Sequence, residues 1–179
     1  MPRIELPRGS IAIVDTSVIF AMGGPSNDKY QAFESYVTRR DAAVRIPDHV
    51  AEELGESPDR YRYQRDRLRS AQDAGWLERA EVDFTDAGVS DAIDRTRERI
   101  FHLSADDVTE DDVETTDAVL AGLAYQYATE QSRPVAVLVS DRLAERAIED
   151  VLDAMGISGD TDVVEGRRFL TELVGDTRD

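Results

Sequence analysis

The chain of 179 residues contains no cysteine, a single lysine and two histidines. The absence of cysteine excludes disulfides, thiolate zinc sites and a cysteine nucleophile. Two histidines make a catalytic triad hard to build, and no convincing one is present. No apolar run approaches the roughly 20 residues of a membrane span, and the first residues lack the apolar core of a signal peptide. We therefore expect a cytoplasmic protein with no membrane contact.

Carboxylates, by contrast, are in large excess. The chain carries 38 Asp and Glu against 21 Lys and Arg, for a net charge of −17. Strong acidity with scarce lysine resembles the composition of halophilic, haloarchaeal proteins, in which salt screens the repulsion between carboxylates. Such a charge would ordinarily argue against a nucleic-acid partner. In a salt-adapted protein it reflects the solvent, so that only local charge is informative about partners.

Short apolar runs alternate with longer helical patterns along the chain, which predicts an α/β fold. Strands are expected at 11–14, 43–46 and 134–139, with weaker ones at 76–82 and 162–164. Helices are expected at 30–39, from 47 past 54, and at 57–73, 87–101, 115–129, 143–155 and up to about 174. No linker or repeat interrupts this pattern. We predict one domain over residues 1–179, with three α/β/α layers around a central parallel sheet of four to five strands.

Two acids stand at the ends of the clearest strands, Asp15 directly and Asp141 after Ser140. Asp15 follows the run 11–14 and Asp141 follows 134–139. In an open parallel sheet both would emerge at the carboxyl ends of strands, where such folds place their sites. Glu53, in the helix after the second strand, and Asp117, at the start of the helix before the best strand, occupy comparable positions. Carboxylates together with water suit Mg²⁺ or Mn²⁺.

Each acid also has an ordinary structural interpretation. Asp15 fits a turn at a strand end, and Asp141 fits the N-cap of the following helix. Asp117 fits the first turn of a helix, where the macrodipole favours a negative charge. Glu53 fits an exposed helix face.

Four segments resemble the signature segments of PIN-domain ribonucleases, in the same order. They are Val14–Val18, Glu53-Leu54, Thr116–Ala121 and Val139–Arg142. The resemblance covers nearly the whole chain and implies Mg²⁺- or Mn²⁺-dependent, in-line hydrolysis of RNA phosphodiesters. Carried over by position, it implies that Asp15, Glu53, Asp117 and Asp141 bind the metal. Ser17 matches a small polar position that orients the first acid, and Ser140 matches a comparable one beside the last.

Three features leave alternatives open. Glu52 adjoins Glu53, although Glu53 fits better beside Leu54. The segment Arg60–Arg69 is basic and carries two tyrosines; it suits either RNA phosphates and bases or an amphipathic helix whose arginines pair with acids. The acidic run 106–114 suits either a solvated surface or a small basic antitoxin-like partner. RNA is the expected substrate, and related domains often form homodimers.

A non-catalytic PIN-like module that binds RNA or protein is the main alternative function, although all four acids are present. Other aspartate-based α/β enzymes fit poorly. A haloacid-dehalogenase-type phosphatase would need a second Asp where Ser17 stands, and a phospho-receiver domain would need a late lysine, whereas Lys29 is the single lysine of the chain.

Overall fold

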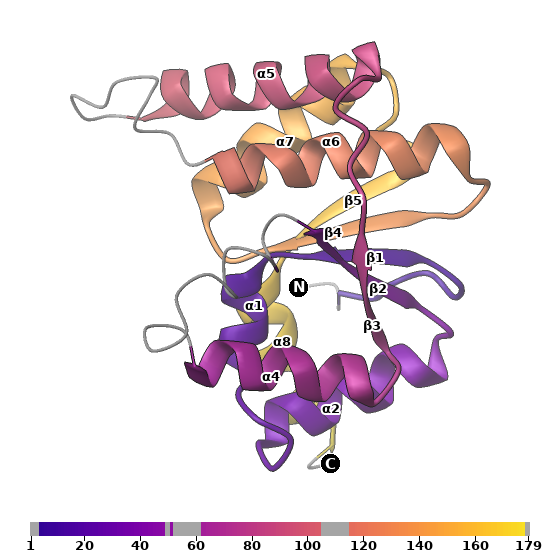
Figure 1. Cartoon of the computed structure of the whole chain (residues 1–179), viewed down its shortest axis with the longest axis vertical. Coiled ribbons are helices and arrows are strands. Elements are labelled where there is room, and N and C mark those ends of the chain that lie inside the picture. Colours follow the sequence, from indigo (N-terminus) through magenta and orange to yellow (C-terminus); the bar gives the residue numbers. More distant parts are fainter. Residues whose placement is uncertain (1–3, 49–50, 52–61, 105–114, 178–179) are drawn as a thin grey trace.

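A computed structural model of the chain describes residues 4–48, 51, 62–104 and 115–177. Its five strands form one parallel sheet in the order β3-β2-β1-β4-β5 (Figure 1). The strands are β1 (Ile11–Val14), β2 (Ala43–Pro47), β3 (Leu77–Ala80), β4 (Val135–Val139) and β5 (Thr161–Glu165). The helices are α1 (Thr16–Met22), α2 (Asp28–Arg39), α4 (Arg62–Asp73), α5 (Ala87–Leu103), α6 (Thr115–Glu130), α7 (Arg142–Ala154) and α8 (Gly166–Thr177).

Alternate residues of the central strands supply two separate hydrophobic cores, one on each face of the sheet. Ala12, Val14 and Leu138 pack with α1, α2, α4 and α8, whereas Ile13 and Val137 pack with α6 and α7. Every residue of β1 and β4 is buried. Helices therefore cover both faces of the sheet, which explains why these strands read as continuous apolar runs.

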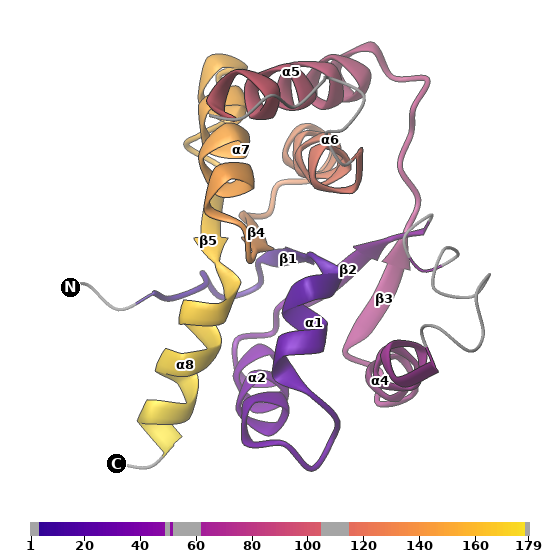
Figure 2. The ribbon, with the colours of Figure 1, turned by 90° about the vertical axis from the view of Figure 1, so that its left-hand side faces the viewer.

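The outer helix α5 lies beyond α6 and α7, so that α6 is enclosed between α5 and the sheet (Figures 1 and 2). Residues on several sides of α6 are buried, among them Ala118, Leu120 and Leu123. At Gly122 a Cβ would lie 2.6 Å from Cγ1 of Ile93, so the absence of a side chain lets α5 approach closely. The fold is thus the predicted three-layer α/β/α arrangement with an additional helix outside one layer.

The structure confirms the predicted parallel sheet, and it corrects the prediction in one place. The sequence pattern gave no helix between Asp15 and the loop at 23–27, but residues 16–22 form α1. Seven residues span too few turns to show a helical period. Most of the helix predicted after β2, including Glu52 and Glu53, lies outside the described residues, as does the acidic run 106–114. Within the described part of the chain, no helix is long and apolar enough to cross a membrane.

Candidate active site

The candidate site lies where the chain changes direction across the sheet. After the central strand β1, the next two strands, β2 and β3, lie on one side of it in the sheet. The last two strands, β4 and β5, lie on its other side. Open α/β sheets bind ligands at such a switch point, outside the carboxyl ends of the strands. Asp15 follows β1 there, and Ser140 and Asp141 follow β4. The backbone N–H of Asp15 donates to the carbonyl of Leu138 over 3.0 Å, so the two loops begin side by side.

Asp15 is the most enclosed of the three proposed site acids that the structure describes, with a relative exposure of 8%. It is the N-cap of α1, and its carboxylate accepts hydrogen bonds from the backbone N–H of Ser17 at 3.5 Å and from the Ser17 hydroxyl at 2.7 Å. The Thr16 hydroxyl also donates to it, at 3.4 Å. These donors hold the carboxylate in one orientation. Thr16 is a contact that sequence reasoning missed, because the helix that places it was not predicted.

The hydroxyls of Ser17 and Ser140 connect the two strand ends, since their oxygens lie within hydrogen-bond distance, at 2.5 Å. A hydroxyl has one proton to donate. Ser17 donates its proton to Oδ2 of Asp15, so the Ser140 hydroxyl must be the donor to Ser17. A directed chain therefore runs from Ser140 through Ser17 to Asp15, and it joins three of the residues that the sequence singled out.

Asp141 stands next to this chain as the N-cap of α7. Its Oδ1 accepts from the backbone N–H groups of Leu143 at 2.7 Å and Ala144 at 3.4 Å. The capping role considered for Asp141 is therefore present. Both bonds use the same oxygen, and Oδ2 receives no hydrogen bond from any residue in the described ranges. Asp141 is also solvent-exposed, so one carboxylate oxygen is accessible for a ligand.

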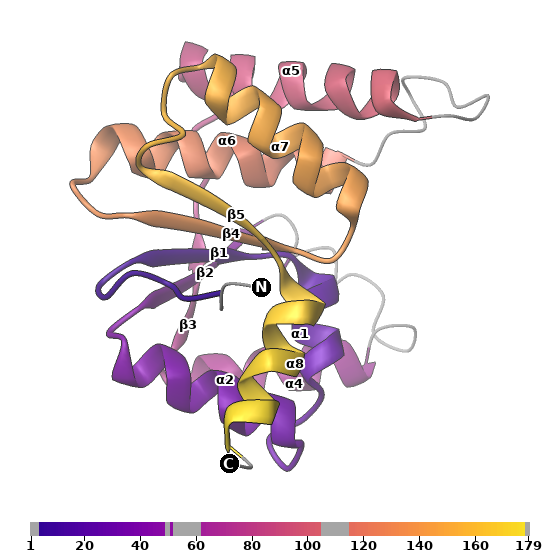
Figure 3. The same ribbon diagram turned by 180° about the vertical axis from the view of Figure 1, so that it is seen from behind.

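Asp117 lies in the first turn of α6, where it is half-buried. Because α6 precedes β4 and runs back along the sheet, its first turn lies at the edge where β1 and β4 end (Figures 1 and 3). Glu53, the fourth predicted acid, lies outside the described residues. Among those that are described, no group of three or more acidic or histidine side chains is arranged closely enough to hold a metal ion. The structure thus brings Asp15, Ser17 and Ser140 into contact and places Asp117 and Asp141 at the same edge.

The first turn of α7 adds charged side chains beside Asp141. Partial burial raises the pKa of the Glu145 carboxyl, and the nearby carboxylates of Glu149 and Glu165 raise it further, while Arg142 and Arg168 oppose the shift. Glu145 is thus surrounded by charged side chains of both signs. Arg142 ends the segment Val139–Arg142 that resembles a PIN signature, whereas nothing in the sequence distinguishes Glu145 from other surface charges.

The basic segment Arg60–Arg69 forms the first part of α4, as far as the structure describes it. Arg67 donates from Nη1 to the carbonyl of Phe20 in α1, at 3.0 Å. Leu68 is buried in the core, as the amphipathic interpretation of this segment requires. Arg67 is therefore engaged in holding α4 against the helix that follows Asp15, while Arg69 is exposed.

The groups at this edge are carboxylate and hydroxyl oxygens, which fit a hard divalent cation such as Mg²⁺ or Mn²⁺. Asp15 would enter such a site already oriented by three donors, and Asp141 would present its uncapped oxygen. Cysteine does not occur in the chain, so no thiolate competes for a softer metal. The donor set is thus suited to phosphodiester chemistry that depends on a hard cation.

The profile of the halobacterial PIN domain matches residues 8–178. A similar solved structure is the crystal structure of VapBC2 from Rickettsia felis bound to a DNA fragment from their promoter, with 9% sequence identity and a TM-score of 0.47. The similarity covers 76% of this chain and 92% of that one. No protein of curated function matches the chain.

Proposed function

Because the chain belongs to the halobacterial PIN domain family, and PIN domains are in general nucleases, we propose that it is a metal-dependent endoribonuclease. It would hydrolyse RNA phosphodiester bonds at the edge formed by the carboxyl ends of β1 and β4. The observation that carries this proposal is the directed hydroxyl chain from Ser140 through Ser17 to the buried carboxylate of Asp15.

Asp15, Glu53, Asp117 and Asp141 are the residues that would hold Mg²⁺ or Mn²⁺. A divalent cation bound there would acidify water and stabilise the leaving oxygen. The protein's own contribution is to fix the carboxylates beforehand. Ser17 and the N-terminus of α1 orient Asp15, and Ser140 in turn orients Ser17, so these groups need little rearrangement when they bind a ligand.

Substitution of the two strand-end acids tests this assignment. Asp15→Asn and Asp141→Asn each remove a negative charge but keep a side-chain oxygen that can cap a helix, so α1 and α7 should stay folded. We expect each variant to lose at least about 100-fold in the rate of Mn²⁺-dependent RNA cleavage, because the lost interaction contributes several kcal/mol in the transition state. The measurement is cleavage of labelled RNA in high-salt buffer, with thermal melting to verify folding.

Asp86→Asn is the matched control. Asp86 is the N-cap of α5 and accepts from Val89 N–H at 3.0 Å, so it undergoes the same change in the same structural role on a helix outside the candidate site. This variant should cleave RNA at the wild-type rate. Full activity of folded Asp15→Asn or Asp141→Asn would show that the site is assigned wrongly.

The same experiment separates the enzyme from a non-catalytic RNA- or protein-binding module. A wild-type protein that binds RNA but never cleaves it, with Mn²⁺ or Mg²⁺ present and in high salt, would favour the module. A second copy of the chain and a small antitoxin-like protein stay predictions for further partners.

A further inference from the structure

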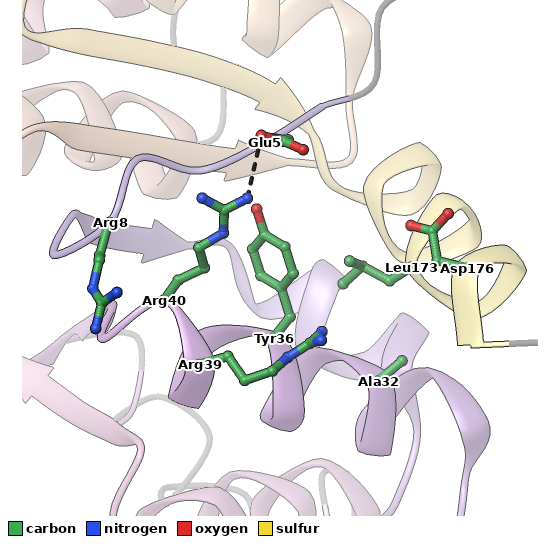
Figure 4. Close-up of a pocket in the computed structure, with 8 residues that line it drawn as sticks. All are labelled: Glu5, Arg8, Ala32, Tyr36, Arg39, Arg40, Leu173 and Asp176. Carbon is green, nitrogen blue, oxygen red and sulfur yellow. Dashed lines mark ion pairs between the residues drawn. The ribbon is translucent and has the colours of Figure 1, made fainter.

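A pocket of about 490 Å³ lies on the face of the sheet that α2 and α8 cover, and it includes residues that precede β1 and β2. It is enclosed by α2, α8 and the segment that leads into β1, and Figure 4 shows the residues that line it. Because α2 runs back along the sheet before β2, its last residue, Arg39, and its C-cap, Arg40, lie at the edge where the strands begin. Arg8 joins them from the segment before β1.

The charge of this pocket is opposite to that of the chain. Arg8, Arg39 and Arg40 line it against two acids, Glu5 and Asp176, in a protein whose net charge is −17. Other cavities differ. One of about 360 Å³ is lined by Glu149, Asp150, Asp153 and Asp162 without any base, and one of about 520 Å³ has Arg133 against Glu130 and Asp160. The pocket between α2 and α8 is therefore a local basic site on an acidic surface.

Arg40 is held in place by its neighbours. Its Nη2 lies 3.2 Å from a carboxylate oxygen of Glu5, and its guanidinium lies 5.5 Å from the ring centroid of Tyr36. The Tyr36 hydroxyl accepts from the backbone N–H of Leu6 at 2.8 Å, and its ring packs edge-on against Phe169. The floor of the pocket is thus ordered before any ligand arrives.

Arg39 and Arg8 keep donors available. Toward the residues that the structure describes, Arg39 donates only from Nε, to the carbonyl of Ser35 at 3.3 Å. Arg8 is exposed, and it makes no hydrogen bond or ion pair with any residue that the structure describes. Guanidinium groups are planar forks that match the oxygens of phosphate and carry their charge at every accessible pH. Figure 4 shows Arg39 and Arg8 on opposite sides of Arg40, and the three guanidinium groups together give the pocket a positive charge that suits a ligand with two negative charges.

We propose that this pocket binds a phosphate monoester of nucleotide size. Its volume lies in the range of small-molecule sites. Tyr36 is only 7% exposed and its ring is covered by Arg40, so no aromatic face is available to stack on a base. The arginines would therefore recognise the phosphate group, which belongs either to a free nucleotide or to the 5′ end of an RNA strand. The site is separate from the proposed nuclease edge and does not depend on it.

Isothermal titration calorimetry in high-salt buffer with EDTA tests the proposal without any cleavage. We expect 5′-AMP to bind and adenosine, which lacks the phosphate, not to bind. A short RNA with a 5′-phosphate is compared with the same RNA bearing a 5′-hydroxyl. Tighter binding of the phosphorylated strand than of AMP identifies an RNA end as the ligand, and equal or weaker binding identifies a free nucleotide. If AMP and adenosine behave alike, the proposal is wrong.

Variants locate the binding. Arg39→Gln and Arg8→Gln should each weaken AMP binding about tenfold, which corresponds to one lost charge-assisted contact, and Arg39→Lys should lose less because it keeps the charge. Arg95→Gln is the matched control, since Arg95 is an exposed arginine on α5 that pairs with Asp91 at 2.9 Å. Wild-type affinity in folded Arg39→Gln and Arg8→Gln would overturn the assignment to this pocket.

Discussion

At the scale of single residues, two acids of the proposed site are also helix N-caps. Asp141 caps α7, as its ordinary structural interpretation predicted, and Asp15 caps α1, where the sequence suggested only a turn at a strand end. The two roles do not compete at Asp141, because both capping bonds use Oδ1. An N-cap also brings the positive end of a helix toward the carboxylate, which lowers the cost of gathering negative charges at one edge.

Ser140 allows a test of the hydroxyl chain by itself. Ser140→Ala removes the donor to Ser17, which frees the Ser17 hydroxyl to rotate and loosens Asp15. Loss of such an orienting partner typically weakens metal affinity by 10- to 100-fold. We therefore expect about tenfold more Mn²⁺ to be needed for half-maximal cleavage, with the rate largely recovered at saturating Mn²⁺. The measurement is the cleavage rate as a function of Mn²⁺ concentration.

Ser132→Ala is the control for this variant, because Ser132 is exposed in the turn before β4, at the other end of that strand. It should leave the Mn²⁺ dependence unchanged. An unchanged Mn²⁺ dependence in Ser140→Ala as well would mean that the hydroxyl chain only supports packing.

At the scale of elements, the contact between α1 and α8 helps to hold in place the helix that begins after Asp15. Gly166 begins α8, and a Cβ there would lie 2.5 Å from Cγ2 and 3.0 Å from Cγ1 of Val18 in α1. Val18 is fully buried, so it has little room to move. The absence of a side chain at Gly166 therefore lets α8 pack against the helix that Asp15 caps.

Two glycines of α8 form a matched pair for testing this contact. Gly166→Ala should destabilise the protein by about 1–3 kcal/mol through overpacking, which lowers the melting temperature by about 2–4 °C per kcal/mol in a domain of this size. Gly175→Ala, in the same helix, meets nothing within 4 Å and should be neutral or slightly stabilising, because alanine favours the helix. The measurement is thermal unfolding in high salt. Equal melting temperatures would show that α1 and α8 are not tightly packed.

The elements also show where prediction from sequence succeeds. The strands β1 and β4 were predictable because burial on both faces makes them continuous apolar runs. The helix α6 was predictable from its apolar residues, but its enclosure on several sides was not, since this depends on α5 lying over it. The helix α1 was missed because it is short and is stabilised mainly by tertiary contacts, as short helices generally are.

At the scale of the whole molecule, the net charge of −17 predicts that folding depends on the salt concentration. We expect the melting temperature to rise by about 10 °C or more between 0.1 M and 2 M KCl, because the screening length falls from about 10 Å at 0.1 M to about 3 Å at 1 M. Thermal unfolding across a KCl series measures this. Sucrose at matched osmolality is the uncharged control and should give a smaller rise; a melting temperature independent of KCl would contradict the halophilic interpretation.

The sequence by itself determined the α/β class, the parallel sheet and the positions of Asp15 and Asp141 at strand ends, because local hydrophobic patterns encode strands, helices and their order. Only the tertiary structure decided that β1 and β4 are neighbours at a switch point, that Ser140 reaches Ser17, and that Arg8 shares a pocket with Arg39. These are contacts between residues far apart in the chain, and they depend on how the helices pack. Asp15 and Asp141 thus began as two acids among 38, and the fold places them on adjacent strand ends joined by two hydroxyls.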